Sequence, residues 1–202
     1  MAPIRFGLAI LALVALAPAS RAQTAPASFI RGKITALTGH TLTVATREGH
    51  TATIELADPF TVTAVKAVEL GSITKGDFVG IAAEPGPGGA LHAQEVLVFP
   101  EAMRGTGEGF RPWDLTPHST MTNATVSGMV QAQDGRQLEL TYKGGNKTIA
   151  VPQGVPVVTL IPAQASDAVP GTAVFLSATK KPDGTYAASR ITIGKGGVAP
   201  PM

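Results

Sequence analysis

The sequence contains no cysteine, few charged residues and few aromatic residues. Without cysteine, the chain forms no disulfide and carries no lipid through a thioether or thioester. Charged residues make up only 15% of the 202 residues and aromatic residues 5%, so the basic groove and stacking rings of a nucleic-acid-binding surface are lacking. After the N-terminal segment, no apolar run is long enough to cross a membrane. We therefore expect no nucleic-acid partner and no membrane span in the mature chain.

The N-terminal segment has the features of a secretory signal. Residues 6–17 form an unbroken apolar run, which is shorter than the roughly 20 residues that a membrane-spanning helix needs. Ser20 and Ala22 place small residues at the −3 and −1 positions of a cut before Gln23. We predict a signal peptide over residues 1–22, cleaved near Ala22-Gln23, and a periplasmic or secreted mature protein.

The composition of the mature chain favours short strands joined by tight turns. Cleavage removes Arg5 and Arg21, and residues 1–22 contain no acidic residue, so 14 basic residues (16 minus 2) face 14 acidic ones. A net charge of zero argues against a polyanion partner. The 23 glycines and 16 prolines, among many Thr and Val, are typical of strands and turns.

Two stretches of the chain show the same order of strand patterns. Apolar and polar residues alternate with the period of two that indicates half-buried strands. Each stretch predicts five strands, with its longest connection between the third and the fourth. In the first stretch we expect an extended piece over residues 60–65. We also expect one helical turn over residues 72–75, with Ser72 as its cap.

The two stretches align as an internal repeat. Gly32 falls on Gly128 at an offset of 96 residues, and Gly76 falls on Gly171 at an offset of 95 after the loss of one residue. Turn glycines and apolar positions match together while polar positions differ, which a duplication constrained by packing would produce. With only two copies and this long a period, a solenoid is excluded.

The predicted fold class is all-β, with two tandem five-stranded OB-like barrels that arose by internal duplication. The predicted domains are residues 29–99 and 126–194, joined by a long ordered connection over residues 100–125 and followed by a flexible tail over residues 195–202. An alternative is that each repeat forms half of one larger sandwich.

The repeat carries a resemblance to a known group of proteins. Its motifs are G-x-[IV]-x-A in the first strand, G-[DT]-x-V in the fourth and G-x-x-x-A-x-x-[IV]-x-[IV] in the fifth. On these motifs the chain resembles an uncharacterised (DUF) family of exported bacterial proteins with tandem OB-like domains. The resemblance implies fold and compartment, and it implies no activity.

The connection between the repeats contains the only tryptophan, Trp113. Tryptophan and arginine are enriched in binding hot spots, so Arg111, Trp113 and Asp114 are the predicted partner-binding residues. The partner is a protein or a small molecule of unknown identity. The alternative is that the connection packs onto the barrels through apolar anchors, namely Met103, Phe110, Trp113 and Leu115.

A metal site and a catalytic site are the other hypotheses for the connection. Met103, His118 and Met121 offer thioether and imidazole ligands, which suit Cu(I). In fold and residue type this set is similar to the small periplasmic copper chaperone of bacterial efflux systems. Copper is therefore the only cofactor considered.

Catalysis has little support in the sequence. Three carboxylates of the connection could supply an acid–base pair, and they are Glu101, Glu108 and Asp114. The chain has no nucleophile elbow and no cysteine nucleophile. We therefore expect a non-enzymatic envelope protein, a binding or scaffold module, with copper binding as the alternative and catalysis by loop carboxylates as a remote one.

Overall fold

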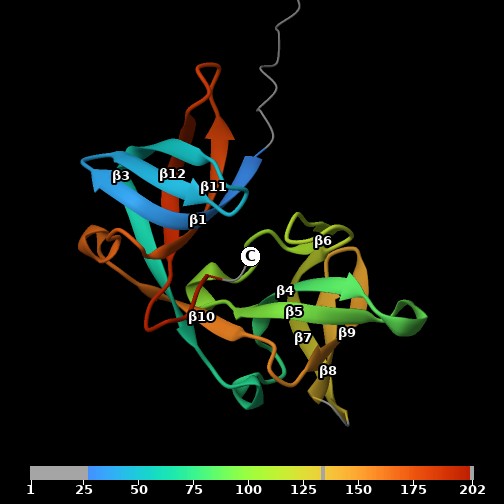
Figure 1. The fold of residues 1–202 in the computed structure, drawn as a ribbon. Coiled ribbons are helices and arrows are strands. Elements are labelled where there is room, and N and C mark those ends of the chain that lie inside the picture. Colours follow the sequence, from blue (N-terminus) through green and yellow to red (C-terminus); the bar gives the residue numbers. More distant parts are fainter. Residues whose placement is uncertain (1–26, 133–134, 201–202) are drawn as a thin grey trace, which may run out of the picture.

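The computed structural model describes residues 27–132 and 135–200, and within them the fold is all-β (Figure 1). The all-β prediction is confirmed. Among these residues the only helices are four short 3-10 turns, and none is long and apolar enough to cross a membrane. The predicted signal peptide, residues 1–22, lies outside the described residues.

Twelve strands are present in the described residues. They are β1 (Ala27–Thr38), β2 (Thr41–Thr46), β3 (Thr51–Ala67), β4 (Phe78–Pro85), β5 (Leu91–Val98), β6 (Gly109–Pro112), β7 (Thr120–Ala132), β8 (Gly135–Tyr142), β9 (Gly145–Pro152), β10 (Val157–Pro162), β11 (Ala173–Lys180) and β12 (Tyr186–Ile193). The 3-10 turns are η1 (Leu70–Ser72), η2 (Pro87–Gly89), η3 (Glu101–Met103) and η4 (Ala165–Asp167).

Five strands close into a first ring in the order β1, β2, β3, β12, β11. Each neighbour in this order is hydrogen-bonded to the next, and β11 returns to β1 through antiparallel pairs such as Ile30 with Leu176. The alternating apolar residues of these strands point inward and form one core, which includes Ile34, Leu42 and Ile54. A closed five-stranded barrel is thus confirmed.

A second ring follows the order β4, β7, β8, β9, β5. Antiparallel ladders join β4, β7, β8 and β9, and β5 pairs with β4. The ring closes through a short parallel ladder between β5 and β9, which has two residue pairs. Its inward residues form a second core, which includes Ile81, Leu138 and Ile149.

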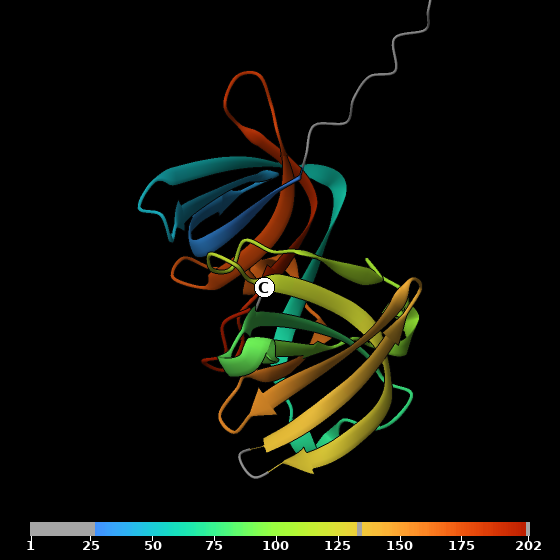
Figure 2. The ribbon, with the colours of Figure 1, turned by 90° about the vertical axis from the view of Figure 1, so that its right-hand side faces the viewer.

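The two rings do not follow the predicted tandem order. The first ring takes β1–β3 from the first repeat and β11–β12 from the second, and the second ring takes β4–β5 from the first repeat and β7–β9 from the second. Figures 1 and 2 show β3 running out of one ring toward the other. The predicted separate domains, residues 29–99 and 126–194, therefore exchange strands.

The exchange is made at a crossing between the rings. The C-terminal part of β3 pairs antiparallel with β10, and Val65 lies opposite Leu160 at the middle of the ladder. On its other edge β3 pairs with β12 of the first ring, and β10 pairs with β5 of the second. Val65, Leu97, Val158 and Leu160 form a third apolar cluster there. Val65 and Leu160 are also aligned with each other in the predicted repeat, at the offset of 95 residues. The antiparallel ladder therefore pairs matching positions and is locally two-fold symmetric.

The alignment of the first strands requires a correction. The Gly76 amide donates to the Val126 carbonyl and the Gly171 amide donates to the Ile34 carbonyl, both at 2.8 Å. Ile34 thus corresponds to Val126, at an offset of 92 instead of 96. Ile34 pairs with Val44, 10 residues further on, and Val126 pairs with Leu140, 14 residues further on, so the β7–β8 hairpin is four residues longer (14 minus 10). Matching Gly32 to Gly128 therefore shifted the alignment.

Three local predictions also change. The helical turn lies at Leu70–Ser72, so Ser72 ends it and donates its hydroxyl to the Glu69 carbonyl at 2.7 Å instead of capping its start. The expected extended piece is part of one continuous strand, β3. β7 begins at Thr120, which places the last six residues of the predicted connection in a strand.

Part of the predicted C-terminal tail lies against the fold. Lys195 and Val198 form a β-bridge, and Val198 packs against the crossing cluster. The preceding Gly194 amide donates to the Ala173 carbonyl at 2.8 Å. These contacts hold residues 194–198 beside the first ring, and the flexibility of the tail stays a prediction.

Replacing Gly32 by alanine should destabilise the protein more than replacing Gly128. A Cβ at Gly32 would lie 2.1 Å from the Ala45 carbonyl oxygen, which is fixed in a strand, whereas a Cβ at Gly128 would meet the carboxylate end of Glu139, which can rotate away. We expect Gly32→Ala to cost about 2 kcal/mol or more of unfolding free energy and Gly128→Ala less than about 1 kcal/mol. Urea denaturation measures both, and equal losses would show that the Ala45 carbonyl does not exclude a side chain at position 32.

Cutting the connection should leave the two halves of the chain together. A site for a sequence-specific protease, inserted between Arg104 and Gly105 in an exposed turn, would yield two fragments. Each ring needs strands from both fragments, so the nicked protein should elute as the intact one in size-exclusion chromatography. The fragments should separate only in denaturant, and separation in native buffer would show that the strands are not exchanged.

Candidate functional site

An apolar cavity of about 200 Å³ lies where the two rings meet, beneath the connection. Both rings and the crossing contribute to its wall. The apolar lining comes from Leu97, Phe99, Met103, Trp113, Met121, Leu160 and Phe175. The polar lining comes from Thr106, Arg111, Asn123, Arg190 and Thr192. Apolar side chains, the tryptophan and two arginines thus meet in this hollow.

The connection is held against both rings. At the end of η3, Met103 packs against the apolar cluster of the crossing. β6 then pairs antiparallel with β7 of the second ring, from Gly109 opposite Asn123 to Pro112 opposite Thr120. The chain next reaches the first ring at Trp113. The ordered connection is thus built from pairing and side-chain packing, as its apolar residues suggested.

Trp113 docks on aromatic residues that face outward from the first ring. Its ring lies 4.3 Å from that of Phe29, which in turn stacks on Phe175 with centroids 6.0 Å apart. Phe29 and Phe175 stand on the outer face of their strands, because the neighbouring residues Ile30 and Val174 point into the core. Offset and tilted aromatic pairs of this kind stabilise a contact beyond the area that they bury.

A buried arginine completes this contact. The guanidinium of Arg31 lies between 5.2 and 5.9 Å from the ring centres of Phe29, Trp113 and Phe175. It also donates to the Asp114 carboxylate at 2.8 Å. Arg47 donates to the Asp114 carbonyl oxygen at 2.8 Å. The charge and the rings together fix this part of the connection on the first ring.

Arg111 lies on the opposite side of the tryptophan. Its guanidinium is 5.4 Å from the centre of the Trp113 ring and donates to the Gly107 carbonyl at 2.8 Å. Its half-burial lowers the pKa of Arg111 below its ordinary value, because desolvation disfavours the charged form. In residues 27–132 and 135–200, no carboxylate forms an ion pair with Arg111 or with Arg190.

Asn123 and Gly80 shape the wall on the side of the second ring. The Asn123 side-chain amide donates to the Thr106 carbonyl at 2.9 Å, and its buried oxygen has no hydrogen-bond partner among the described residues. A Cβ at Gly80 would lie 2.9 Å from that oxygen and 3.0 Å from the Phe99 ring. The absence of a side chain at Gly80 therefore lets Asn123 and Phe99 approach the β4 backbone.

The structure brings together the three predicted partner-binding residues. Arg111 and Trp113 both line the cavity, and Asp114 follows them on the first ring. The contacts of Trp113 and Asp114 are made within the chain, which favours the alternative that they anchor the connection. Phe110 differs from the expected anchors, since it is 40% exposed and has the Lys147 ammonium 4.4 Å from its ring.

The predicted copper ligands are only partly assembled. Met103 and Met121 both line the cavity, whereas His118 does not. His118 lies exposed in the turn before β7, with a positive φ of 73°. In the described part of the chain, no three His, Cys, Asp or Glu side chains gather in a way that could hold a metal ion. Copper binding stays a prediction that rests on two thioethers.

The three carboxylates proposed for catalysis lie in separate contacts. Glu101 pairs with Arg104 at 2.6 Å, and the hydrogen bond from Arg104 lowers the pKa of that carboxyl. Glu108 accepts from the Lys143 backbone amide at 3.0 Å. Asp114 pairs with Arg31. None of these contacts joins two of the carboxylates into an acid–base pair.

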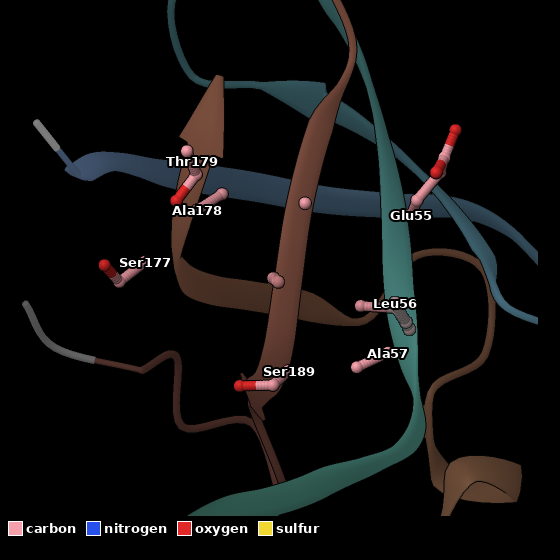
Figure 3. A pocket seen from close by; sticks show the side chains of 9 residues that line it. Glu55, Leu56, Ala57, Ser177, Ala178, Thr179 and Ser189 are labelled. Atoms are coloured by element: carbon pink, nitrogen blue, oxygen red, sulfur yellow. The ribbon is translucent and has the colours of Figure 1, made fainter. Parts of the chain in front are cut away.

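A second hollow opens in the wall of the first ring, where β11 and β12 separate (Figure 3). It has a volume of about 440 Å³ and is lined mainly by small side chains, such as Ser177 and Ser189, with Leu56 from β3. Its one acidic residue, Glu55, is paired with Lys181. The hollow is open and carries no uncompensated charge, so we favour the cavity between the rings.

The sequence patterns did not single out Phe175 and Arg190, which line the cavity, or Phe29, which contacts Trp113 beside it. Phe29, Phe175 and Arg190 lie in strands that were treated as scaffold. A large aromatic residue at an outward-facing position of an alternating strand was the available signal for Phe29 and Phe175. Nothing in the local sequence marked Arg190, because its place at the cavity depends on the strand exchange.

The contact between Phe29 and Trp113 should be measurable as a coupling energy. We expect Trp113→Leu to leave the protein folded and to cost about 1–3 kcal/mol of unfolding free energy. In a double-mutant cycle with Phe29→Leu, the coupling should be about 0.5–1.5 kcal/mol. Phe110→Leu serves as the exposed control, with an expected change within about 0.5 kcal/mol. A coupling near zero would mean that Trp113 does not anchor the connection on the first ring.

Comparison of the chain with protein-family models, curated proteins and solved structures finds no match. The resemblance to a family of exported bacterial proteins, the OB-like type of the rings and the duplication therefore stay predictions. The function is argued from the geometry of the cavity.

Proposed function

We propose that the mature chain is a non-enzymatic binding protein of the cell envelope, periplasmic or secreted, which holds a small ligand between its two rings. The observation that supports this most is the apolar cavity at the junction, with the connection docked over it. Ligand sites commonly lie where two structural units meet. The compartment rests on the predicted signal peptide.

The size and lining of the cavity indicate the scale of the ligand. Its volume of about 200 Å³ is below the roughly 300–1,000 Å³ of pockets for drug-sized molecules. A short aliphatic chain or a single ring is therefore the expected guest. Met103 and Met121 add unbranched, polarisable side chains, which can adapt to the shape of different apolar guests.

The same contacts give less support to the other hypotheses. Catalysis would need carboxylates that face one another across a substrate, and the carboxylates of the connection are each engaged elsewhere. Copper would need a third ligand beside the two thioethers, and His118 is not part of the cavity wall. A protein partner could still contact the connection, whose outer surface includes Phe110 and Asp114.

Binding of 1-hexanol tests whether the cavity accepts an apolar guest. Trp113 is the only tryptophan, so its indole N–H gives one identifiable signal in a proton–nitrogen correlation spectrum. We expect this signal to shift saturably with hexanol, because the indole lines the cavity. Thr106→Phe, at an exposed position of the wall, should weaken hexanol binding about tenfold or more by filling the space.

A matched change in the second hollow provides the control. Ser189→Phe lies in the wall of the first ring and should leave hexanol binding unchanged. Loss of hexanol binding in Ser189→Phe but not in Thr106→Phe would show that hexanol binds in the second hollow and not in the cavity between the rings. The absence of a saturable shift with hexanol, hexanoate and hexylamine alike would overturn the proposed function.

A further inference from the structure

The charged groups at the cavity are of one sign. Arg111 reaches it from β6, beside the second ring, and Arg190 reaches it from β12 of the first ring. The cavity lining contains no acidic residue. Asp114, which lies beside the aromatic cluster, does not change this, because its carboxylate is paired with Arg31 at 2.8 Å.

Burial of Arg111 carries a desolvation cost, which contacts within the chain offset only in part. A half-buried guanidinium loses hydration, and an acidic partner normally compensates for that loss. Here its compensation comes from the Gly107 carbonyl and from the face of Trp113 at 5.4 Å. An anion bound at the cavity would supply the missing partner, and it would also face the exposed guanidinium of Arg190.

We propose that the ligand is a small amphipathic monoanion, with its apolar part in the cavity and a carboxylate head at Arg111 and Arg190. This inference rests on the proposed function and adds the chemical class of the ligand. A guanidinium presents N–H donors in a planar fork that matches a carboxylate. The apolar wall selects against hydrophilic anions such as acetate, since these leave the cavity unfilled.

Three six-carbon probes that differ only in the head group test the charge. Hexanoate, 1-hexanol and hexylamine are titrated into the full mature chain at neutral pH and low salt, with the Trp113 indole signal as readout. We expect hexanoate to bind about tenfold more tightly than hexanol, and hexylamine to bind more weakly than hexanol. Added salt should weaken hexanoate binding and leave hexanol binding nearly unchanged.

Substitutions at the two arginines assign the effect to the cavity. Arg190→Gln removes an exposed charge with no ion pair in the described chain, and it should weaken hexanoate binding about fivefold while hexanol binding changes less than about twofold. Arg111→Gln should do the same, and Arg111→Lys should restore part of the hexanoate affinity. Arg136→Gln, in a different hollow, is the control and should change neither.

The outcomes separate this inference from the proposed function. Equal affinities for hexanoate and hexanol would overturn the anionic ligand and leave the apolar binding site standing. Tighter binding of hexanoate that is unaffected by Arg190→Gln and Arg111→Gln would also overturn it, because the head group would then lie elsewhere. Failure of all three probes would overturn both.

Discussion

The antiparallel ladder between β3 and β10 is the contact on which the arrangement of the molecule depends. Its five residue pairs are centred on Val65 and Leu160. Each of the two strands is also hydrogen-bonded to a ring, β3 to β12 and β10 to β5, so the ladder joins both rings in one continuous sheet. Val65 and Val158 are almost fully buried there. The ladder is therefore the place where a strand from the first half of the chain, β3, is hydrogen-bonded to a strand from the second half, β10, between the two rings.

The candidate site follows from the same crossing. Leu160 and Leu97 of the crossing cluster form part of the cavity wall, and the connection closes over them through Met103 and Trp113. The connection has no counterpart elsewhere in the predicted repeat. It pairs with the second ring through β6 and stacks on the first ring through Trp113. The two rings thus enclose one cavity, to whose wall the connection contributes Met103, Arg111 and Trp113.

The sequence predicted the elements better than their partners. Alternation identified the strands, and the turn glycines bounded them. The exchange of strands could not be predicted from the sequence, because matching strands of the two predicted repeats have the same apolar pattern. Val79 and Val174, for example, occupy matching inward positions in different rings. Gly32 and Gly128 misled the alignment, since only Gly32 is required by a close backbone contact. At the site, the sequence pointed to Arg111 and Trp113, but it could not place Arg190, which reaches the cavity through long-range pairing.

The strand exchange also determines the order in which the two rings can fold while the chain is synthesised, N-terminus first. The second ring has all its strands once residue 152 is available, whereas the first ring waits for β12, which ends at residue 193. The strands β1–β3, made first, therefore remain incomplete the longest. Contacts between distant parts of a chain slow folding. The export that we propose for this chain would benefit from such a delay, because the earliest strands cannot complete a barrel before the last residues have been made.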